Sequence, residues 1–130
     1  MIDFCILGSG VSGSTIANLL SKKYSVKVFD KARGPGGRSS NKRFKGNLSF
    51  DHGVQYISPK SKQFLKFAKK LCKNKTLKTW NENHLDFTFE KQPLLDRYIG
   101  KKANNDLVKY NLKGIKPVSY THLTLPTTDR

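Results

Sequence analysis

The first thirty residues contain two apolar runs separated by a helical stretch. The run Ile2–Leu7 ends at Gly8, a helical pattern continues through Leu20, and the run Ser25–Phe29 ends at Asp30. This order predicts a βαβ unit, in which the two strands are adjacent and parallel and the crossover is right-handed. We therefore expect an α/β fold with a Rossmann-like βαβ unit.

Shorter elements follow. Asn41–Phe44 and Leu48–Phe50 read as two strands around a Lys45–Asn47 turn. Ser61–Lys73 reads as a helix, because apolar side chains recur on one face and lysines on the other.

The later pattern predicts the start of a second, substrate-binding domain. Leu77–Trp80 and Leu85–Glu90 read as paired strands, and Trp80 either lines the substrate site or simply packs. Asn104–Leu112 reads as a short helix, with Asn104 or Asn105 as its cap.

A glycine motif connects the first strand to the first helix. Gly8 permits a sharp turn, Gly10 leaves room for a pyrophosphate, and Gly13 lets helix and strand pack closely. The helix N-terminus offers unpaired N–H groups to phosphates. The pattern predicts a dinucleotide site built on Gly8, Gly10, Gly13 and the N-terminus of this helix.

The second strand ends in an acidic residue and a basic loop. Asp30 lies 22 residues beyond Gly8, where a carboxylate accepts hydrogen bonds from a ribose diol. Residues 31–40 are glycine-rich and leave no room for the second crossover helix of a simple NAD-binding unit. We expect this loop to bring backbone N–H groups and Arg38 to the same pyrophosphate, since guanidinium binds phosphate in a bidentate way.

These motifs resemble the flavin-dependent amine oxidase superfamily, and within it the renalase-like branch of NAD/FAD-dependent oxidoreductases. The likeness rests on Gly8–Gly13, Asp30, Gly36–Ser39 and Phe50–Tyr56, and it extends over about Ile2 to Lys116. The segments at Trp80, Arg97–Gly100 and Asn105–Val108 also have counterparts in that branch. The chain departs from its relatives at Asp30, where many carry Glu, and at Lys101–Ala103, where Pro and Gly are usual.

The resemblance implies FAD as the cofactor. The pyrophosphate would meet Arg38 and the first helix, the adenosine ribose would meet Asp30, and the isoalloxazine ring would lie near Gly53–Tyr56. The full set of expected FAD contacts is Gly8, Gly10, Val11, Ser12, Gly13, Asp30, Lys31, Gly37, Arg38, Ser39, Gly53 and Gln55.

The implied activity is oxidation of an amine or a dihydronicotinamide-type substrate, by hydride transfer to FAD and electron transfer to oxygen. The alternative is a flavoprotein that uses FAD in a non-redox or isomerising step. No catalytic residue can be assigned. Asp51 and His52 are adjacent on a predicted strand and face opposite sides, so we expect His52 to pack or hydrogen-bond rather than act as an acid or base.

The net charge of +16 raises the possibility of a nucleic-acid-binding module. Lysines outnumber arginines 20 to 5, are dispersed, and lack the interleaved aromatic residues of single-strand binders. A solvated charged face is therefore favoured, with a small-molecule substrate as partner and neither nucleic acid nor membrane.

The remaining sequence features are negative. There is no signal-peptide pattern and no apolar run long enough to cross a bilayer, so we expect a cytoplasmic protein. Cys5 and Cys72 read as buried, reduced side chains, and the three scattered histidines predict no metal site.

The domain boundaries predicted from these patterns are residues 1–75 for a partial FAD-binding domain and 76–117 for the start of a substrate domain and a return segment. Val118–Thr127 resembles the translation of a transposase adapter used in sequencing libraries. We therefore expect residues 118–130 to be a non-native tail, in coil or only loosely docked, on an N-terminal fragment of a longer flavoprotein. Such a fragment would be inactive alone, and its oligomeric state stays open.

Overall fold

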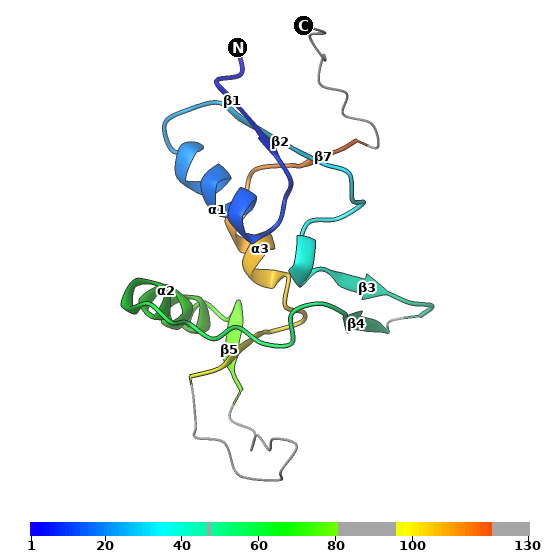
Figure 1. The fold of residues 1–130 in the computed structure, drawn as a ribbon, viewed down its shortest axis with the longest axis vertical. Helices are drawn as coiled ribbons and strands as arrows, with labels where there is room; N and C mark the ends of the chain where they lie inside the picture. Colours follow the sequence, from blue (N-terminus) through cyan, green and yellow to red (C-terminus); the bar gives the residue numbers. More distant parts are fainter. Residues whose placement is uncertain (47, 81–95, 121–130) are drawn as a thin grey trace, which may run out of the picture.

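The structure, a computed structural model, describes residues 1–46, 48–80 and 96–120. It begins with β1 (Phe4–Leu7), α1 (Val11–Leu20) and β2 (Val26–Asp30). The two strands are parallel neighbours, in a register that runs from Phe4 opposite Val26 to Leu7 opposite Phe29. The predicted βαβ unit and α/β fold are confirmed (Figure 1).

A third strand, β7 (Val118–Ser119), pairs in parallel with the other edge of β2, so the sheet order is β1-β2-β7. The Tyr120 N–H donates to the Asp30 carbonyl at 2.8 Å. The expectation of coil or loose docking is therefore wrong at Val118–Ser119. The edge of β2 offers backbone N–H and C=O groups for pairing. An extended segment can pair with them even when its apolar and polar side chains do not alternate as in a typical strand. The rest of the predicted tail, residues 121–130, lies outside the described residues.

The helix α3 (Asp106–Asn111) packs beside α1 and contributes to the core next to the β1-β2-β7 sheet (Figure 1). The Asn18 side chain donates to the Asn111 carbonyl at 2.9 Å, and the Asn111 side chain donates to Thr15 Oγ1 at 3.1 Å. Apolar side chains fill the space between the two helices and the sheet; the buried ones include Ala17, Val28, Leu107 and Val108. The short helix was predicted, and its N-cap is Asn105, although no side-chain capping bond forms.

The segments after β2 form a turn and a hairpin. The 3-10 turn η1 (Gly37–Ser39) leads into β3 (Asn41–Arg43), which pairs antiparallel with β4 (Ser49–Asp51). This hairpin was predicted from the sequence. Its bounds differ by a residue or two from those expected.

The helix α2 (Lys62–Lys73) begins at Ser61, whose hydroxyl accepts the Phe64 N–H at 3.1 Å. After it, β5 (Leu77–Thr79) pairs antiparallel with β6 (Tyr98–Gly100). The expected partner of the first of these strands was Leu85–Glu90, which lies outside the described residues.

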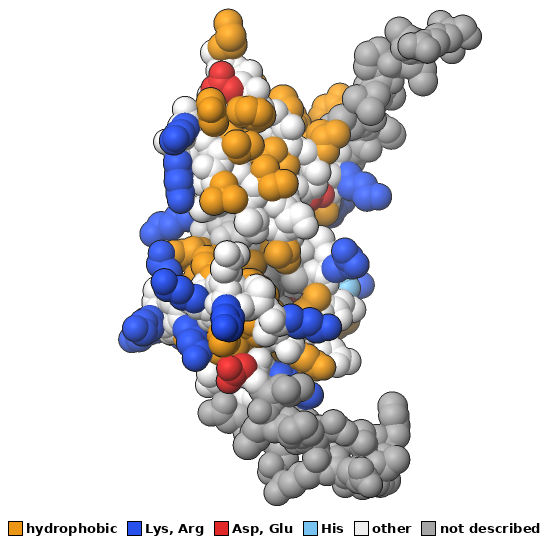
Figure 2. Space-filling view, turned by 60° about the vertical axis from the view of Figure 1, so that its left-hand side comes forward, with side chains coloured by type: hydrophobic (Ala, Val, Ile, Leu, Met, Phe, Trp, Pro, Cys, Tyr) orange, Lys and Arg blue, Asp and Glu red, His pale blue; other side chains and the backbone are white. Residues whose placement is uncertain are grey.

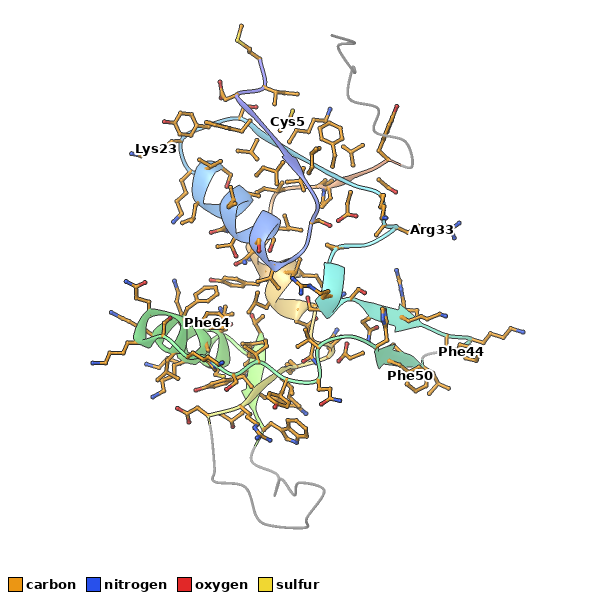
Figure 3. The ribbon with its side chains drawn as sticks, viewed as in Figure 1. Cys5, Lys23, Arg33, Phe44, Phe50 and Phe64 are labelled. Atoms are coloured by element: carbon orange, nitrogen blue, oxygen red, sulfur yellow. The ribbon has the colours of Figure 1, made fainter. Side chains whose placement is uncertain are left out.

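The first part of the chain carries exposed apolar side chains. They include Phe4, Cys5 and Leu7 of β1 and Ile16 and Leu19 of α1. Figure 2 shows apolar side chains gathered on the upper part of the molecule. The expected burial of Cys5 is therefore wrong, because in the described part of the chain only Ile6 of β1 packs against the core. Phe44 and Phe50 likewise project from the hairpin (Figure 3).

Candidate functional site

The turn between β1 and α1 opens the N-terminus of the helix. Gly8 has φ +94°, a conformation that L side chains rarely adopt. Gly10 is the N-cap of α1, and no side chain caps the helix. The first N–H groups of α1 are therefore available to an anion, and the helix dipole favours one there.

Two further glycines set how closely the backbone segments approach. A Cβ on Gly13 would lie 2.0 Å from the Gly8 carbonyl oxygen, so only glycine fits where α1 meets the end of β1. Gly37, at φ +54°, lies against Gly10: a Cβ there would be 3.1 Å from the Gly10 Cα. The Gly36 N–H also donates to the Ser9 carbonyl at 3.1 Å. The β1–α1 turn and the Gly36–Ser39 segment therefore form one assembly.

A hollow of about 560 Å³ lies between these two segments; we call it the cradle. Eight of the twelve residues expected to bind the cofactor line it: Gly8, Gly10, Val11, Ser12, Gly13, Gly37, Arg38 and Ser39. Leu7, Gly36 and Val54 complete the lining. Residues up to 47 positions apart in the sequence, from Leu7 to Val54, thus converge on one site.

Asp30 lies next to the cradle but not in its lining. Its carboxylate accepts hydrogen bonds from the Ser9 N–H at 2.6 Å, from the Ser9 hydroxyl, and from the Ala32 N–H at 2.8 Å. A carboxylate has about four acceptor positions, so one remains for a ribose hydroxyl. Lys31 is exposed and also outside the lining.

The pKa of Asp30 reflects these contacts. Burial alone raises the pKa, but the Ser9 hydroxyl, the Ala32 and Ser9 N–H groups and the Lys31 charge outweigh it and hold the pKa below its ordinary value of 3.8. The carboxylate is therefore ionised at neutral pH, as a hydrogen-bond acceptor for ribose requires.

This lowered pKa predicts a pH dependence of stability. The native state binds fewer protons at Asp30 than the unfolded state, so its contribution is full above the ordinary value of 3.8 and is lost as pH falls through the lower native pKa. Unfolding free energies of wild type and Asp30→Asn, measured by urea denaturation, should differ by a constant amount above about pH 5 and converge below it. A difference that persists unchanged in strong acid would contradict the assignment.

The segment around Gly53 is anchored to the cradle. The Val54 N–H donates to the Arg38 carbonyl at 3.0 Å, and a Cβ on Gly53 would lie 2.0 Å from that same oxygen. The Ser39 hydroxyl donates to the Gly36 carbonyl at 2.8 Å and fixes the turn that carries Arg38. Gly53 therefore acts through packing on the Arg38 backbone.

Gln55 lies at a second hollow, of about 400 Å³, together with Trp80, Lys78, Lys101 and Lys102. The adjacent Tyr56 contacts Trp80, with ring centroids 5.7 Å apart. The structure therefore separates Gln55 from the residues that line the cradle, and Val54 connects the two hollows along the chain.

Asp51 and His52 do not form an acid–base pair in the structure. The Asp51 carboxylate accepts from the Asn104 N–H at 3.1 Å and from the Asn41 side chain at 3.1 Å. His52 Nε2 lies 3.0 Å from the Ser40 hydroxyl. The prediction of separate faces and hydrogen-bonding roles is consistent with these contacts.

Sequence reasoning missed two residues that hold the site together. Ser9, with no exposed surface, connects the glycine turn to Asp30 through its backbone and side chain. Asn104 was expected only as a possible helix cap; instead its side chain donates to the Val54 and Gln55 carbonyls at 2.7 and 3.0 Å. Neither role leaves a local sequence signal, because each depends on segments distant in the chain.

Two negative findings concern the described residues only. No group of three or more His, Cys, Asp or Glu side chains among them is arranged to hold a metal ion. Within the same ranges, no helix has the length and apolar character needed to span a membrane.

Comparisons with known proteins agree with this geometry. Over 53 residues the chain is 40% identical to an uncharacterized protein of Methanocaldococcus jannaschii. This alignment covers 41% of the chain and 14% of that protein. Wild-type putrescine oxidase bound to putrescine and a double mutant of the same enzyme each align with a TM-score of 0.50 and 26% identity, over 76% of this chain and 22% of theirs. The chain thus spans less than a quarter of these proteins.

The family assignment rests on a longer match. Residues 6–71, half of the chain, match the family described as NAD(P)-binding Rossmann-like domain. This range includes the end of β1, all of α1 and β2, the residues of the cradle and the anchored Gly53 segment. The chain therefore belongs to the NAD(P)-binding Rossmann-like domain family.

Proposed function

We propose that this chain forms the FAD-binding part of an oxidoreductase similar to the flavin-dependent amine oxidases, with an amine or a dihydronicotinamide as substrate. The observation that carries the proposal is the convergence of eight predicted phosphate-binding residues on one cradle at the open N-terminus of α1. The likeness to putrescine oxidase supports the oxidoreductase class. The finer renalase-like assignment rests on the sequence motifs alone.

The cradle fits a pyrophosphate in shape and chemistry. A Cβ on Gly10 would project into it while approaching nothing closer than 3.8 Å, so the space is left open by the absence of a side chain. Arg38 lines the opposite wall and supplies a bidentate cation. Asp30 adds an ionised acceptor on the ribose side.

The loop after β2 favours FAD over a nicotinamide cofactor as the resident group. Instead of a second crossover helix, the chain runs from Asp30 through a short loop into the η1 turn, which brings Gly37 and Arg38 against the glycine motif. When bound, FAD would supply the hydride-accepting chemistry. The residues of this chain bind its phosphates, orient it, and position the Gly53–Tyr56 segment beside it.

The second hollow supports a substrate side next to the cradle. Val54 lines the cradle, Gln55 lines the second hollow, and Asn104 holds both carbonyls. The Arg97 guanidinium stacks 4.6 Å from the centre of the Tyr56 ring and restricts that ring. Trp80 lines the second hollow and contacts this ring, and an aromatic wall of this kind suits a planar or apolar substrate group.

The proposal is tested with purified protein that contains this sequence. Purified material should absorb at about 450 nm, and anaerobic addition of either a diamine or NADH should bleach that band. Gln55→Ala should slow bleaching while the flavin content stays unchanged. A protein without flavin contradicts the proposal, and bound flavin that neither substrate reduces favours the non-redox alternative.

A further inference from the structure

A third hollow, with distinct chemistry, lies beside the Ala32–Pro35 loop that follows β2. It measures about 460 Å³ and shares no lining residue with the cradle; we call it the basic hollow. Three parts of the chain line it: the Ala32–Pro35 loop, the Ser40–Arg43 segment with His52, and α3 with its N-cap. Figure 3 shows Arg33 on the loop above the β3–β4 hairpin.

Every charged side chain in this lining is a cation, namely Arg33, Lys42, Arg43 and Lys109. Lys109 lies 3.3 Å from Asp106, but the other three form no ion pair with any described residue. Two further carboxylates lie near the hollow: Asp51 accepts hydrogen bonds from Asn104 and Asn41, and Asp30 accepts them from Ser9 and from the Ala32 N–H. A concave site lined by one sign of charge concentrates counter-ions, and guanidinium groups bind phosphate with matched geometry.

Hydrogen bonds hold the walls of the basic hollow in place. The Asn105 side chain donates to the Pro35 carbonyl at 3.3 Å and so links α3 to the loop. The contact between Ser40 and His52, and the pairing of Asn41 with Asp51, fix the hairpin side. The cations therefore extend from a preformed frame, which lowers the entropic cost of binding a ligand.

Asn105 gives a second, independent indication of a ligand. Asn105 lines the basic hollow and is 7% exposed, and its buried Oδ1 has no hydrogen-bond partner among the described residues. Buried polar atoms are normally paired, so a ligand that reaches this oxygen on entering the hollow would supply the missing donor. A phosphate ester with a hydroxyl group, or a water molecule carried with it, supplies such a donor.

We propose that the basic hollow binds the phosphate group of a small hydroxyl-bearing phosphate ester, separately from the cofactor cradle. A bounded hollow suits a small molecule better than a polymer, which would need a continuous track of cations with stacking aromatic residues. The site does not depend on FAD, because no residue is shared with the cradle.

The test is an NMR titration of the full chain with glycerol 3-phosphate, at ionic strength kept constant with chloride. The backbone amide signals of Ser40–Arg43 should shift and saturate. Arg43→Gln should raise the dissociation constant about tenfold, which corresponds to about 1.4 kcal/mol. A parallel titration with inorganic phosphate compares the dissociation constants of the ester and of the free anion. Tighter binding of glycerol 3-phosphate supports the hydroxyl contact. Equal dissociation constants assign the site to free phosphate.

Matched variants keep the result interpretable. Lys42→Gln and Lys45→Gln remove the same charge from the same hairpin, but only Lys42 lines the hollow. Lys42→Gln should weaken binding several-fold and Lys45→Gln hardly at all, and the shifts should persist in Gly10→Ala, which obstructs the cradle. Absent or unsaturable shifts, or equal effects of the two lysine variants, would overturn the proposal. Tighter binding of a single-stranded oligonucleotide, lost equally in both lysine variants, would replace it with a nucleic-acid surface.

Discussion

Replacing Gly13 by alanine is expected to destabilise the chain by about 3 kcal/mol or more, at the upper end of overpacking effects. The added Cβ would lie 2.0 Å from the Gly8 carbonyl oxygen, an atom of the backbone that has no rotamer with which to move away. Relief requires α1 to move off β1, which also separates the helix N-terminus from the glycine turn. Urea unfolding followed by far-ultraviolet circular dichroism measures the loss.

Gly34→Ala is the matched control for this experiment. A Cβ at Gly34 meets nothing within 4 Å, and its φ lies outside the left-handed region. The unfolding free energy should change by less than about 0.5 kcal/mol. If Gly13→Ala were as mild as Gly34→Ala, the close approach of α1 to β1 would be wrong.

Replacing Gly10 by alanine is expected to have the opposite profile, with a large effect on binding and a small one on folding. The Cβ would meet only Gly37 Cα at 3.8 Å and the Gly36 carbonyl at 4.0 Å, which are ordinary contacts. In the cradle this Cβ would keep the pyrophosphate away from the helix N-terminus. Loss of a charge-assisted hydrogen bond there costs about 3 kcal/mol. The affinity for FAD should therefore fall roughly a hundredfold. The unfolding free energy should fall by only about 1 kcal/mol, the usual difference between glycine and alanine at an N-cap.

Binding of FAD to wild type and Gly10→Ala, followed by calorimetry, checks this prediction. The circular dichroism spectra of the two proteins should coincide, which excludes unfolding as the cause. Equal affinities for FAD would remove the helix N-terminus from the cofactor site.

The predictable part of the fold is the part encoded locally. The β1–α1–β2 unit follows from two apolar runs and a glycine turn within thirty residues, and α2 follows from its two-faced pattern. Backbone pairing between distant segments was not predictable. β7 joins β2 through main-chain hydrogen bonds, and β5 pairs with β6, whereas the sequence pattern predicted Leu85–Glu90 as its partner.

The candidate site divides in the same way. Glycines forced by a turn or a close approach are recognisable from spacing, and the structure gathers eight of the predicted residues into the cradle. Gln55 lies in another hollow, and Asp30 lies outside the lining of the cradle and is connected to it through Ser9. These placements were not predictable, because they depend on contacts between residues distant in the sequence. Asn104 shows the limit most clearly, since its position suggests a helix cap whereas its amide holds the Gly53–Tyr56 segment.

The central claim is that this chain holds the ADP half of FAD through the cradle and Asp30. The most direct measurement is equilibrium binding of FAD to the 130-residue chain, with ADP and FMN as competitors. ADP contains the pyrophosphate and the adenosine ribose, so it should displace FAD, whereas FMN, which lacks both, should not. Displacement by FMN but not by ADP, or no binding of FAD at all, would contradict the account.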